Sequence, residues 1–240
     1  MNLIEVNDLH VRYGAYEAVR GVSFTLGKGE ILGIVGESGS GKSTVAKTLM
    51  GLEKKSEGTI AVCLSSMQMI FQDAVGSLNP RMTVRQTLEE VLRCSRKSRL
   101  ASGSSAARTE RSPCELLELV GLSAAVLDQY PREMSGGQCQ RVSIARALAC
   151  EPEVLIADEP VSALDVSVQA RVLNLLRDLR NELGLSILLI AHDLAVVKNV
   201  CDRICVMEHG LFVDVGEAAD VFEHPQSDYT KNLLAAVPRI

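Results

Sequence analysis

A run of nine residues places a lysine and a hydroxyl side chain directly after several glycines. The run fits the pattern of a glycine, four residues and Gly-Lys-Ser/Thr, and reads Gly36-Glu37-Ser38-Gly39-Ser40-Gly41-Lys42-Ser43-Thr44. Glycines let backbone N–H groups approach an anion closely. We therefore predict a loop that binds nucleotide phosphates, with Lys42 on the β- and γ-phosphates and Ser43 as a ligand of Mg²⁺.

The flanking segments favour this interpretation over a chance glycine-rich turn. Residues 31–35 are short, apolar and β-prone, which is typical of a buried strand. Residues 45–50 are predicted to form a helix that stops at Gly51. The N-terminus of that helix would add free N–H donors and a partial positive charge to the loop.

Two neighbouring carboxylates, Asp158 and Glu159, directly follow the apolar run 154–157. In a chain with a phosphate loop, a carboxylate at the end of a buried strand is placed to hold Mg²⁺. The adjacent Glu159 could then polarise an attacking water, and both groups stay ionised beside a cation. Taken alone, the pair could be no more than a polar strand end, but the phosphate loop favours the metal site.

Two further polar residues follow predicted strands. His192 comes after residues 185–191, in a position that suits contact with a γ-phosphate, although a lone histidine at a strand end is more often structural. Gln72 comes after residues 67–71 and could reach the metal through its amide oxygen. An ordinary loop glutamine is the alternative for Gln72.

A second helix start with exposed backbone donors is predicted at Ser135-Gly136-Gly137-Gln138, which precedes the helical stretch 139–149. Ser135 is a good N-cap, and the two glycines leave N–H groups open to an anion. A capped helix with flexible glycines is the alternative. One nucleotide site would need two helix starts of this kind only if two chains shared it.

Composition restricts the class of protein. The 240 residues are 47% hydrophobic with a net charge of −5, which suits one α/β domain and does not favour nucleic acid as a partner. The longest apolar region, residues 185–197, is interrupted by His192 and Asp193, well short of the roughly 20 residues of a membrane span. The first residues lack the features of a signal peptide. We expect a cytoplasmic protein that can dock on a membrane protein.

Strands alternating with helices predict an α/β fold with a mainly parallel sheet and a ligand at the carboxyl ends of its strands. Residues 3–12 alternate apolar and polar side chains, which suggests an edge strand. Residues 95–112 are rich in Ser, Ala and Arg and are predicted to be a solvated loop or a poorly specified helix. Further strands are predicted at 22–26, 58–60, 67–71, 154–157, 185–191, 204–207 and 211–213. Further helices are predicted at 83–93, 113–120, 139–149, 166–183, 194–200 and beyond 217, interrupted at Pro225.

In combination, these motifs resemble the ATP-binding subunit of an ABC transporter. The phosphate loop, Ser135-Gly136-Gly137-Gln138, the run from Leu155 to Pro160, Ser162-Ala163-Leu164-Asp165 and His192 occur in the order of that family. The resemblance implies a phosphate-loop ATPase core with a mainly parallel sheet, a small antiparallel β subdomain and a helical subdomain at about 80–150. It also implies that residues 1–240 form a single domain of this kind.

The resemblance assigns roles around bound ATP and Mg²⁺. It implies that Tyr13 stacks on adenine, with Tyr16 as the alternative. It implies that Asp158 supports Mg²⁺, that Glu159 is the general base and that His192 contacts the γ-phosphate.

The resemblance also implies partners. Gln72 would join the metal site and sense a transmembrane permease subunit. Residues 135–138 would close over ATP held by a second ATP-binding subunit, the same chain or a sister chain, in a head-to-tail dimer with Asp165 at the interface. The chain would lie on the inner face of the cell membrane and serve an extracytoplasmic solute-binding protein indirectly.

A narrower resemblance is to the oligopeptide, dipeptide and nickel importers. Its motifs are Met69-Ile70-Phe71-Gln72-Asp73, the run from Ser77 to Val84, the run from Ala163 to Ala170, and His224-Pro225-Gln226 with the run from Tyr229 to Leu234. Residues 58–68 are shorter than in typical members of the group, and the Ser-rich stretch 95–112 replaces a segment that is usually helical. The alternatives are a soluble ABC-type ATPase outside transport, an export system, and a non-hydrolysing partner of a heterodimer.

Overall fold

The computed structural model describes residues 1–101, 111–162 and 164–236. Its larger sheet has six strands in the order β5-β6-β7-β3-β8-β9, all parallel except β9, which pairs antiparallel with β8. The strands are β3 (Ile31–Val35), β5 (Met67–Ile70), β6 (Val154–Asp158), β7 (Ser186–Ala191), β8 (Arg203–Glu208) and β9 (Leu211–Glu217). The parallel strands β3, β6 and β7 are buried on both faces and are apolar except for Asp158 at the end of β6 and Ser186 at the start of β7. The predicted α/β fold with a mainly parallel sheet is confirmed.

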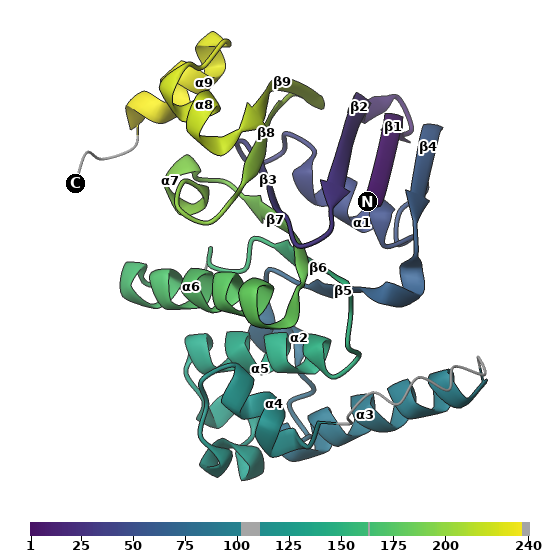
Figure 1. The fold of residues 1–240 in the computed structure, drawn as a ribbon, viewed down its shortest axis with the longest axis vertical. Coiled ribbons are helices and arrows are strands. Elements are labelled where there is room, and N and C mark those ends of the chain that lie inside the picture. The colour runs from purple at the N-terminus through teal and green to yellow at the C-terminus, as the bar shows by residue number, and fades with distance from the viewer. Residues whose placement is uncertain (102–110, 163, 237–240) are drawn as a thin grey trace.

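A smaller antiparallel sheet has the order β2-β1-β4 and lies beside the larger one (Figure 1). Its strands are β1 (Asn2–Tyr13), β2 (Tyr16–Gly27) and β4 (Glu57–Val62). The prediction of an edge strand at 3–12 is wrong, because β1 is the central strand and pairs with both neighbours. Alternation of side chains shows which face of a strand is buried, but it does not show how many partners the strand has.

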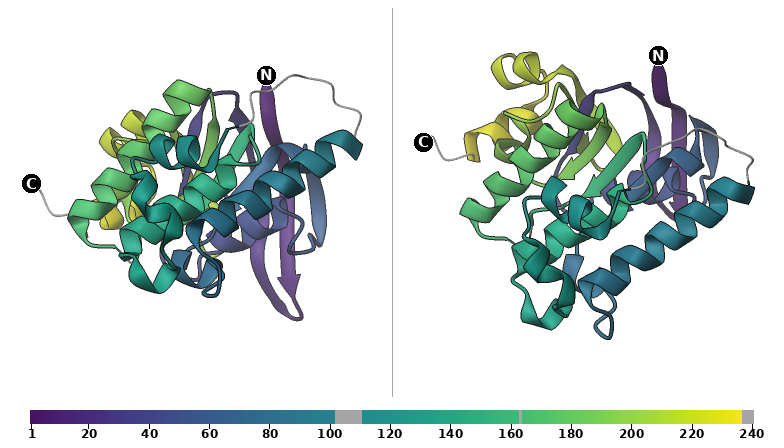
Figure 2. Two further views of the ribbon diagram at one scale, coloured as in Figure 1. Left: turned by 90° about the horizontal axis from the view of Figure 1, so that it is seen from below. Right: turned by 60° about the horizontal axis from the view of Figure 1, so that its bottom comes forward.

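The helices form three groups, which Figures 1 and 2 show around the larger sheet. Those of the lower layer in Figure 1 are α2 (Ala74–Ser77), α3 (Val84–Ala101), α4 (Pro113–Leu119), α5 (Gly136–Leu148) and α6 (Val166–Leu183). Helix α1 (Lys42–Leu49), which follows β3, stands by itself as the second group. The third group is α7 (Leu194–Val197), α8 (Ala218–Glu223) and α9 (Asp228–Ala236). Short 3₁₀ turns are η1 (Leu64–Ser66), η2 (Ala124–Asp128) and η3 (Pro131–Glu133).

Several predicted boundaries moved. Helix α3 runs on to Ala101, so the first part of the stretch 95–112 is helical; residues 102–110 lie outside the described residues. Helix α7 stops at Val197, earlier than the predicted 200. The predicted hairpin is confirmed, since His209 and Gly210 have φ of 46° and 82° and join β8 to β9. None of the helices in the described ranges combines the length and the apolar character needed to cross a membrane.

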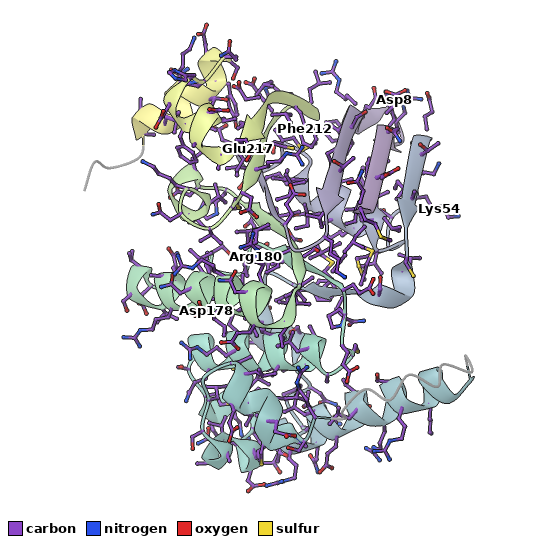
Figure 3. All side chains as sticks on the ribbon, in the orientation of Figure 1. Asp8, Lys54, Asp178, Arg180, Phe212 and Glu217 are labelled. Atoms are coloured by element: carbon purple, nitrogen blue, oxygen red, sulfur yellow. The ribbon has the colours of Figure 1, made fainter. Side chains whose placement is uncertain are left out.

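Each face of the larger sheet has its own core, because successive side chains of a strand point to opposite faces. One face of β3, with Ile31 and Val35, belongs to the core that also contains side chains of α4, α5 and α6. The other face, with Leu32 and Ile34, packs against α1 and the antiparallel sheet. The rings of Phe24 on β2 and Phe212 on β9, the latter labelled in Figure 3, meet edge-on at 5.9 Å between centroids. The two sheets are thereby joined beside the turn that faces the phosphate loop.

Arg180 of α6, also labelled in Figure 3, holds the amino ends of the sheet together. Its Nε donates to the carbonyl oxygen of Gly29 at 2.6 Å, and its Nη2 lies 3.1 Å from Oδ2 of Asp202. Gly29 precedes β3 and Asp202 precedes β8. This ion pair therefore lies at the amino ends of the parallel strands. The polar residues Asp158 and His192 lie at or just beyond the carboxyl ends, at the opposite edge of the sheet.

Candidate nucleotide site

The phosphate loop, residues 36–44, leaves the carboxyl end of β3 between β7 and β8 and enters α1. A Cβ on Gly36 would lie 2.0 Å from the carbonyl oxygen of Met207, and one on Gly41 would lie 2.4 Å from that of Ala18. Gly41 also has φ of 111°, which favours glycine. The β8–β9 turn touches the loop directly, because the N–H of Gly210 donates to the carbonyl oxygen of Ser40 at 2.9 Å. Backbone groups of β2 and of the β8–β9 hairpin therefore confine the loop on two sides.

Lys42 is a buried cation at the start of α1. Its side chain is 3% exposed, and Nζ donates to the carbonyl oxygen of Glu37 at 2.7 Å. Burial lowers the pKa of the Lys42 ammonium, while the carboxylates of Glu159, Asp158 and Glu37 oppose that shift. A buried ammonium group that is held by a neutral carbonyl oxygen can exchange that partner for an anion that enters the loop.

Ser43 and Asp158 form the polar link between α1 and β6. The hydroxyl of Ser43 donates to Oδ1 of Asp158 at 2.8 Å, and Asp158 is only 4% exposed. Burial raises the pKa of the Asp158 carboxyl, the hydrogen bond from Ser43 lowers it, and the neighbouring Glu159 raises it. The structure therefore brings together two of the residues that the sequence analysis assigned to the metal.

Glu159 and Gln72 lie together at the end of β6. The backbone N–H of Glu159 donates to the carbonyl oxygen of Ile190 at 3.0 Å, and Glu159 has φ of 47°, which is strained for a non-glycine residue. Nε2 of Gln72 donates to Oε2 of Glu159 at 2.8 Å and to Oγ of Ser162 at 3.3 Å. An unusual backbone conformation thus directs the Glu159 carboxylate toward Gln72, at the mouth of the loop.

A cleft of about 390 Å³ contains most of these groups. Tyr13, which is 45% exposed, lies on the wall of this cleft. Burial raises the pKa of the Tyr13 phenol, and a hydrogen bond with the Thr44 side chain opposes that shift. Tyr16 also lines the cleft, so both tyrosines that the sequence analysis considered are on this wall. The full lining is Tyr13, Tyr16, Ala18, Ser38, Gly39, Gly41, Lys42, Ser43, Thr44, Gln72 and Glu159.

His192 follows β7, which lies between β6 and β3 in the sheet. Its side chain is exposed and is not among the residues that line the cleft. No hydrogen bond or ion pair joins the His192 ring to another part of the described chain. The fold places this histidine at the carboxyl edge of the sheet, without a contact that defines its role.

Residues 135–138 form the predicted capped helix start, at α5. The N–H of Gln138 donates to Oγ of Ser135 at 3.3 Å, and the N–H of Ser135 donates to Oε1 of Gln138 at 2.9 Å, which makes a capping box. Gly137 packs on the start of α6, where a Cβ would lie 2.6 Å from Cγ1 of Val168. Asp165 caps α6 by accepting from the N–H of Val168 at 3.0 Å. These residues do not line the cleft beside the phosphate loop of their own chain.

Sequence reasoning missed one side chain that contacts the phosphate loop. The N–H of Glu37 donates to the hydroxyl oxygen of Tyr229 at 2.9 Å, although the two residues are 192 positions apart. Tyr229 begins the run from Tyr229 to Leu234 that resembles the oligopeptide, dipeptide and nickel importers, but spacing and residue type alone do not show that its hydroxyl reaches the loop.

A glycine loop that leads from a central strand into a helix, with a buried lysine and a serine–carboxylate pair at its end, defines a phosphate-loop nucleotide-binding protein. Residues 19–162 match the family model described as ABC transporter. The chain belongs to this family and is an ATP-binding member of it.

Individual relatives agree with that assignment. The chain is 44% identical to the oligopeptide transport ATP-binding protein OppF of Salmonella typhimurium strain LT2, over 98% of this chain and 78% of the relative. An ATP-binding cassette of an ABC transporter, solved in its ADP conformation, superposes with a TM-score of 0.80 at 25% identity, covering 99% of this chain and 100% of that one. A dimeric ATP-binding cassette in a post-hydrolysis state with ADP and phosphate gives 0.74 at 26% identity, covering 90% and 98%.

Proposed function

We propose that this chain is the ATP-binding and ATP-hydrolysing subunit of an importer that takes up oligopeptides. The observation that carries the proposal is the hydrogen bond from Ser43 to the buried Asp158 beside Lys42, in a chain similar to an oligopeptide transport ATP-binding protein. The geometry supports phosphate binding and hydrolysis, and the similarity supports the solute. Both parts can be tested separately.

The phosphate loop would hold the phosphate groups of ATP. Two features of the loop fit such a ligand. The loop glycines leave no room for a Cβ at Gly36 and Gly41, and Oγ of Ser40 is buried without a hydrogen-bond partner. Lys42 would exchange the carbonyl oxygen of Glu37 for phosphate oxygens. Because the loop N–H groups and Lys42 are already in place, little reorganisation is needed when the anion enters.

The donor set at the end of the loop fits Mg²⁺. The Ser43 hydroxyl, the Asp158 carboxylate and the amide oxygen of Gln72 are hard oxygen donors, which suit this ion. These residues would hold Mg²⁺, which would supply positive charge to neutralise the phosphate groups. Burial raises the pKa of the Asp158 carboxyl and so disfavours its ionised form. A bound cation would counteract this effect and favour the carboxylate. The three residues predicted for the metal therefore remain our proposal for it.

Glu159 is our choice for the general base. Its carboxylate lines the cleft and is held by Gln72, so a water between Glu159 and the phosphate loop could lose its proton to this group. We propose that His192 contacts the γ-phosphate once ATP is bound, and that Tyr13 stacks on adenine. The exposed ring of Tyr13 on the cleft wall is available for such stacking, and Tyr16 beside it is the alternative.

Residues 135–138 would serve a second ATP-binding subunit, the same chain or a sister chain. These residues are exposed or half-buried at a helix start and lie outside the cleft of their own chain, which is consistent with a site completed across a head-to-tail dimer. A structurally similar cassette was solved as a dimer with ADP and phosphate. Asp165, at the adjoining start of α6, would lie at the same interface.

We further propose that residues 1–240 act as one ATP-binding domain, with a helical subdomain at about 80–150, on the inner face of the cell membrane. Transmembrane permease subunits would dock near Gln72, and an extracytoplasmic solute-binding protein would act through them. Peptides are favoured over nickel as the solute because the similar protein is named for oligopeptide transport. The same name favours a role in transport over a soluble ATPase outside transport.

The hydrolysis proposal is tested by Glu159→Gln. The substitution keeps size and hydrogen bonding but removes the basic carboxylate, so we expect ATP turnover to fall by about 10²- to 10⁴-fold while ATP binding persists. Glu118→Gln on the exposed face of α4 is the matched control and should keep full turnover. Hydrolysis near the parental rate in Glu159→Gln would refute the assignment of the base.

The importer proposal is tested by gentle purification of the tagged chain from native membranes. Recovery with two multi-span membrane subunits, with or without a sister ATPase, is expected. Recovery alone in the soluble fraction, or with ribosomes or DNA, would refute the transport role and leave the ATP site standing. Uptake of a labelled peptide and of nickel by cells with and without the chain then separates the two solutes.

A further inference from the structure

The hydrogen bond between Tyr229 and Glu37 joins the C-terminal helix α9 to the phosphate loop. Glu37 follows the first glycine of the loop, and its backbone N–H is 2.9 Å from the hydroxyl oxygen of Tyr229. Tyr229 is half-buried and packs against the larger hydrophobic core. Its phenol reaches the loop from outside the nucleotide cleft, whose lining does not include it.

The residues next to Tyr229 in the chain hold it in position through hydrogen bonds to strand β9. Thr230 is fully buried, and its hydroxyl donates to Oδ2 of Asp214 on β9. The backbone N–H groups of Gln226 and Ser227 donate to the same carboxylate, each at 3.0 Å. One buried carboxylate thus anchors the start of α9 to β9, and β9 is paired with β8, whose Met207 carbonyl confines Gly36.

The backbone carbonyl group of Glu37 also makes hydrogen bonds within the loop. Its carbonyl oxygen accepts from Nζ of Lys42 at 2.7 Å and from the N–H of Ser40 at 3.2 Å. An anion that binds Lys42 must take that ammonium from the Glu37 carbonyl. When it does so, the hydrogen bond from Glu37 to Tyr229 is one contact that still holds this part of the loop. The hydroxyl of Tyr229 is thus well placed to keep the loop in the shape that accepts phosphate.

We propose that Tyr229 is a positioning residue of the nucleotide site, through which the C-terminal helix sets the conformation of the phosphate loop. The proposal rests on the nucleotide-binding function proposed above and adds a part of the chain far from it in sequence. Tyr229 touches the loop and not the nucleotide, so it acts through the orientation of Glu37 and Lys42. Removing its oxygen leaves the N–H of Glu37 without its partner and loosens the loop.

The test is Tyr229→Phe, which removes the hydroxyl and keeps the packing of the ring. We expect the Kd for a fluorescent ATP analogue to rise by about 2- to 10-fold, the range that corresponds to loss of one hydrogen bond. The midpoint of thermal unfolding should change little. Tyr130→Phe is the matched control, because Tyr130 is also half-buried but lies outside the cleft and away from the loop. It should leave the Kd unchanged.

A second readout separates positioning from general stability. Backbone hydrogen exchange in residues 36–43 should quicken in Tyr229→Phe, while exchange in residues 230–236 stays as in the parent.

Lys42→Ala separates the two proposals, since it should abolish nucleotide binding whether or not Tyr229 matters. An unchanged Kd in Tyr229→Phe, beside lost binding in Lys42→Ala, overturns the positioning role alone. Binding that survives Lys42→Ala overturns the nucleotide site itself. A weakened Kd that comes with faster exchange throughout α9 also overturns the positioning role, because the defect is then one of folding.

Discussion

Gly36→Ala is the substitution for which the structure gives the most direct expectation. A Cβ at Gly36 would lie 2.0 Å from the carbonyl oxygen of Met207 and 3.0 Å from Oγ of Ser40. The serine side chain can rotate, but the carbonyl belongs to the backbone of strand β8, close to its carboxyl end, where Met207 is paired with Phe212 of β9. Real Cβ atoms essentially never come closer than 3.0 Å to such an atom. The first residue of the phosphate loop must therefore move by about 1 Å, the difference between 3.0 Å and 2.0 Å.

That displacement has two measurable consequences. A 1 Å error in the placement of groups that bind the reacting phosphate costs on the order of 10² in rate. Forcing an extra carbon into a packed site costs about 1–3 kcal/mol of folding free energy. For a chain of this size, each kcal/mol lowers the unfolding midpoint by roughly 2–4 °C. We therefore expect about a hundredfold loss of ATP turnover and a fall of about 2–12 °C in the midpoint.

Gly184→Ala provides the control. Gly184 ends α6 with φ of 65° and has open space around a new Cβ, so alanine there costs about 1–2 kcal/mol in backbone strain without any clash. It should lower the unfolding midpoint by a similar amount and leave ATP turnover per folded molecule intact. The assays are phosphate release and thermal unfolding of both variants. Turnover in Gly36→Ala within twofold of the parent would refute the steric reasoning, since the clash would then have been relieved without moving the loop.

Two further predictions concern ionisable groups. Because burial raises the folded-state pKa of Asp158, its charge destabilises the nucleotide-free protein above that pKa, and stability recovers as pH falls through it. Asp158→Asn should therefore raise the unfolding midpoint at neutral pH while abolishing Mg²⁺-dependent hydrolysis, and a lower midpoint would contradict this. His10 has its pKa raised above 6.5, mainly by the hydrogen bond to Glu17 at 2.8 Å, so its stabilising contribution is complete below 6.5 and is lost as pH rises through the higher folded value. An NMR titration should give a His10 midpoint above 6.5 that falls in Glu17→Gln; an unaltered midpoint would argue against the pair.

Most of the candidate site could be predicted from local sequence. The glycine spacing before Lys42 and Ser43 identified the loop, and the apolar run before Asp158 placed a carboxylate at the same edge of the sheet. Both follow from short-range rules, because parallel strands present their carboxyl ends together. The roles of Tyr13 and His192 came from the family resemblance. Tyr13 lines the cleft, as does Tyr16, and its role there stays a prediction, whereas the exposed ring of His192 makes no contact that would define its role.

What the sequence by itself determined is therefore the set of elements, their buried faces and the loop chemistry, since these depend on residues a few positions apart. Only the tertiary structure decided that β1 is a central strand, that Met207 and Ala18 carbonyls exclude side chains from Gly36 and Gly41, and that Tyr229 holds Glu37. Each of these is a contact between segments far apart in the chain. Local periodicity fixes which face of a segment is buried, but which distant segment covers it depends on how all the layers pack together.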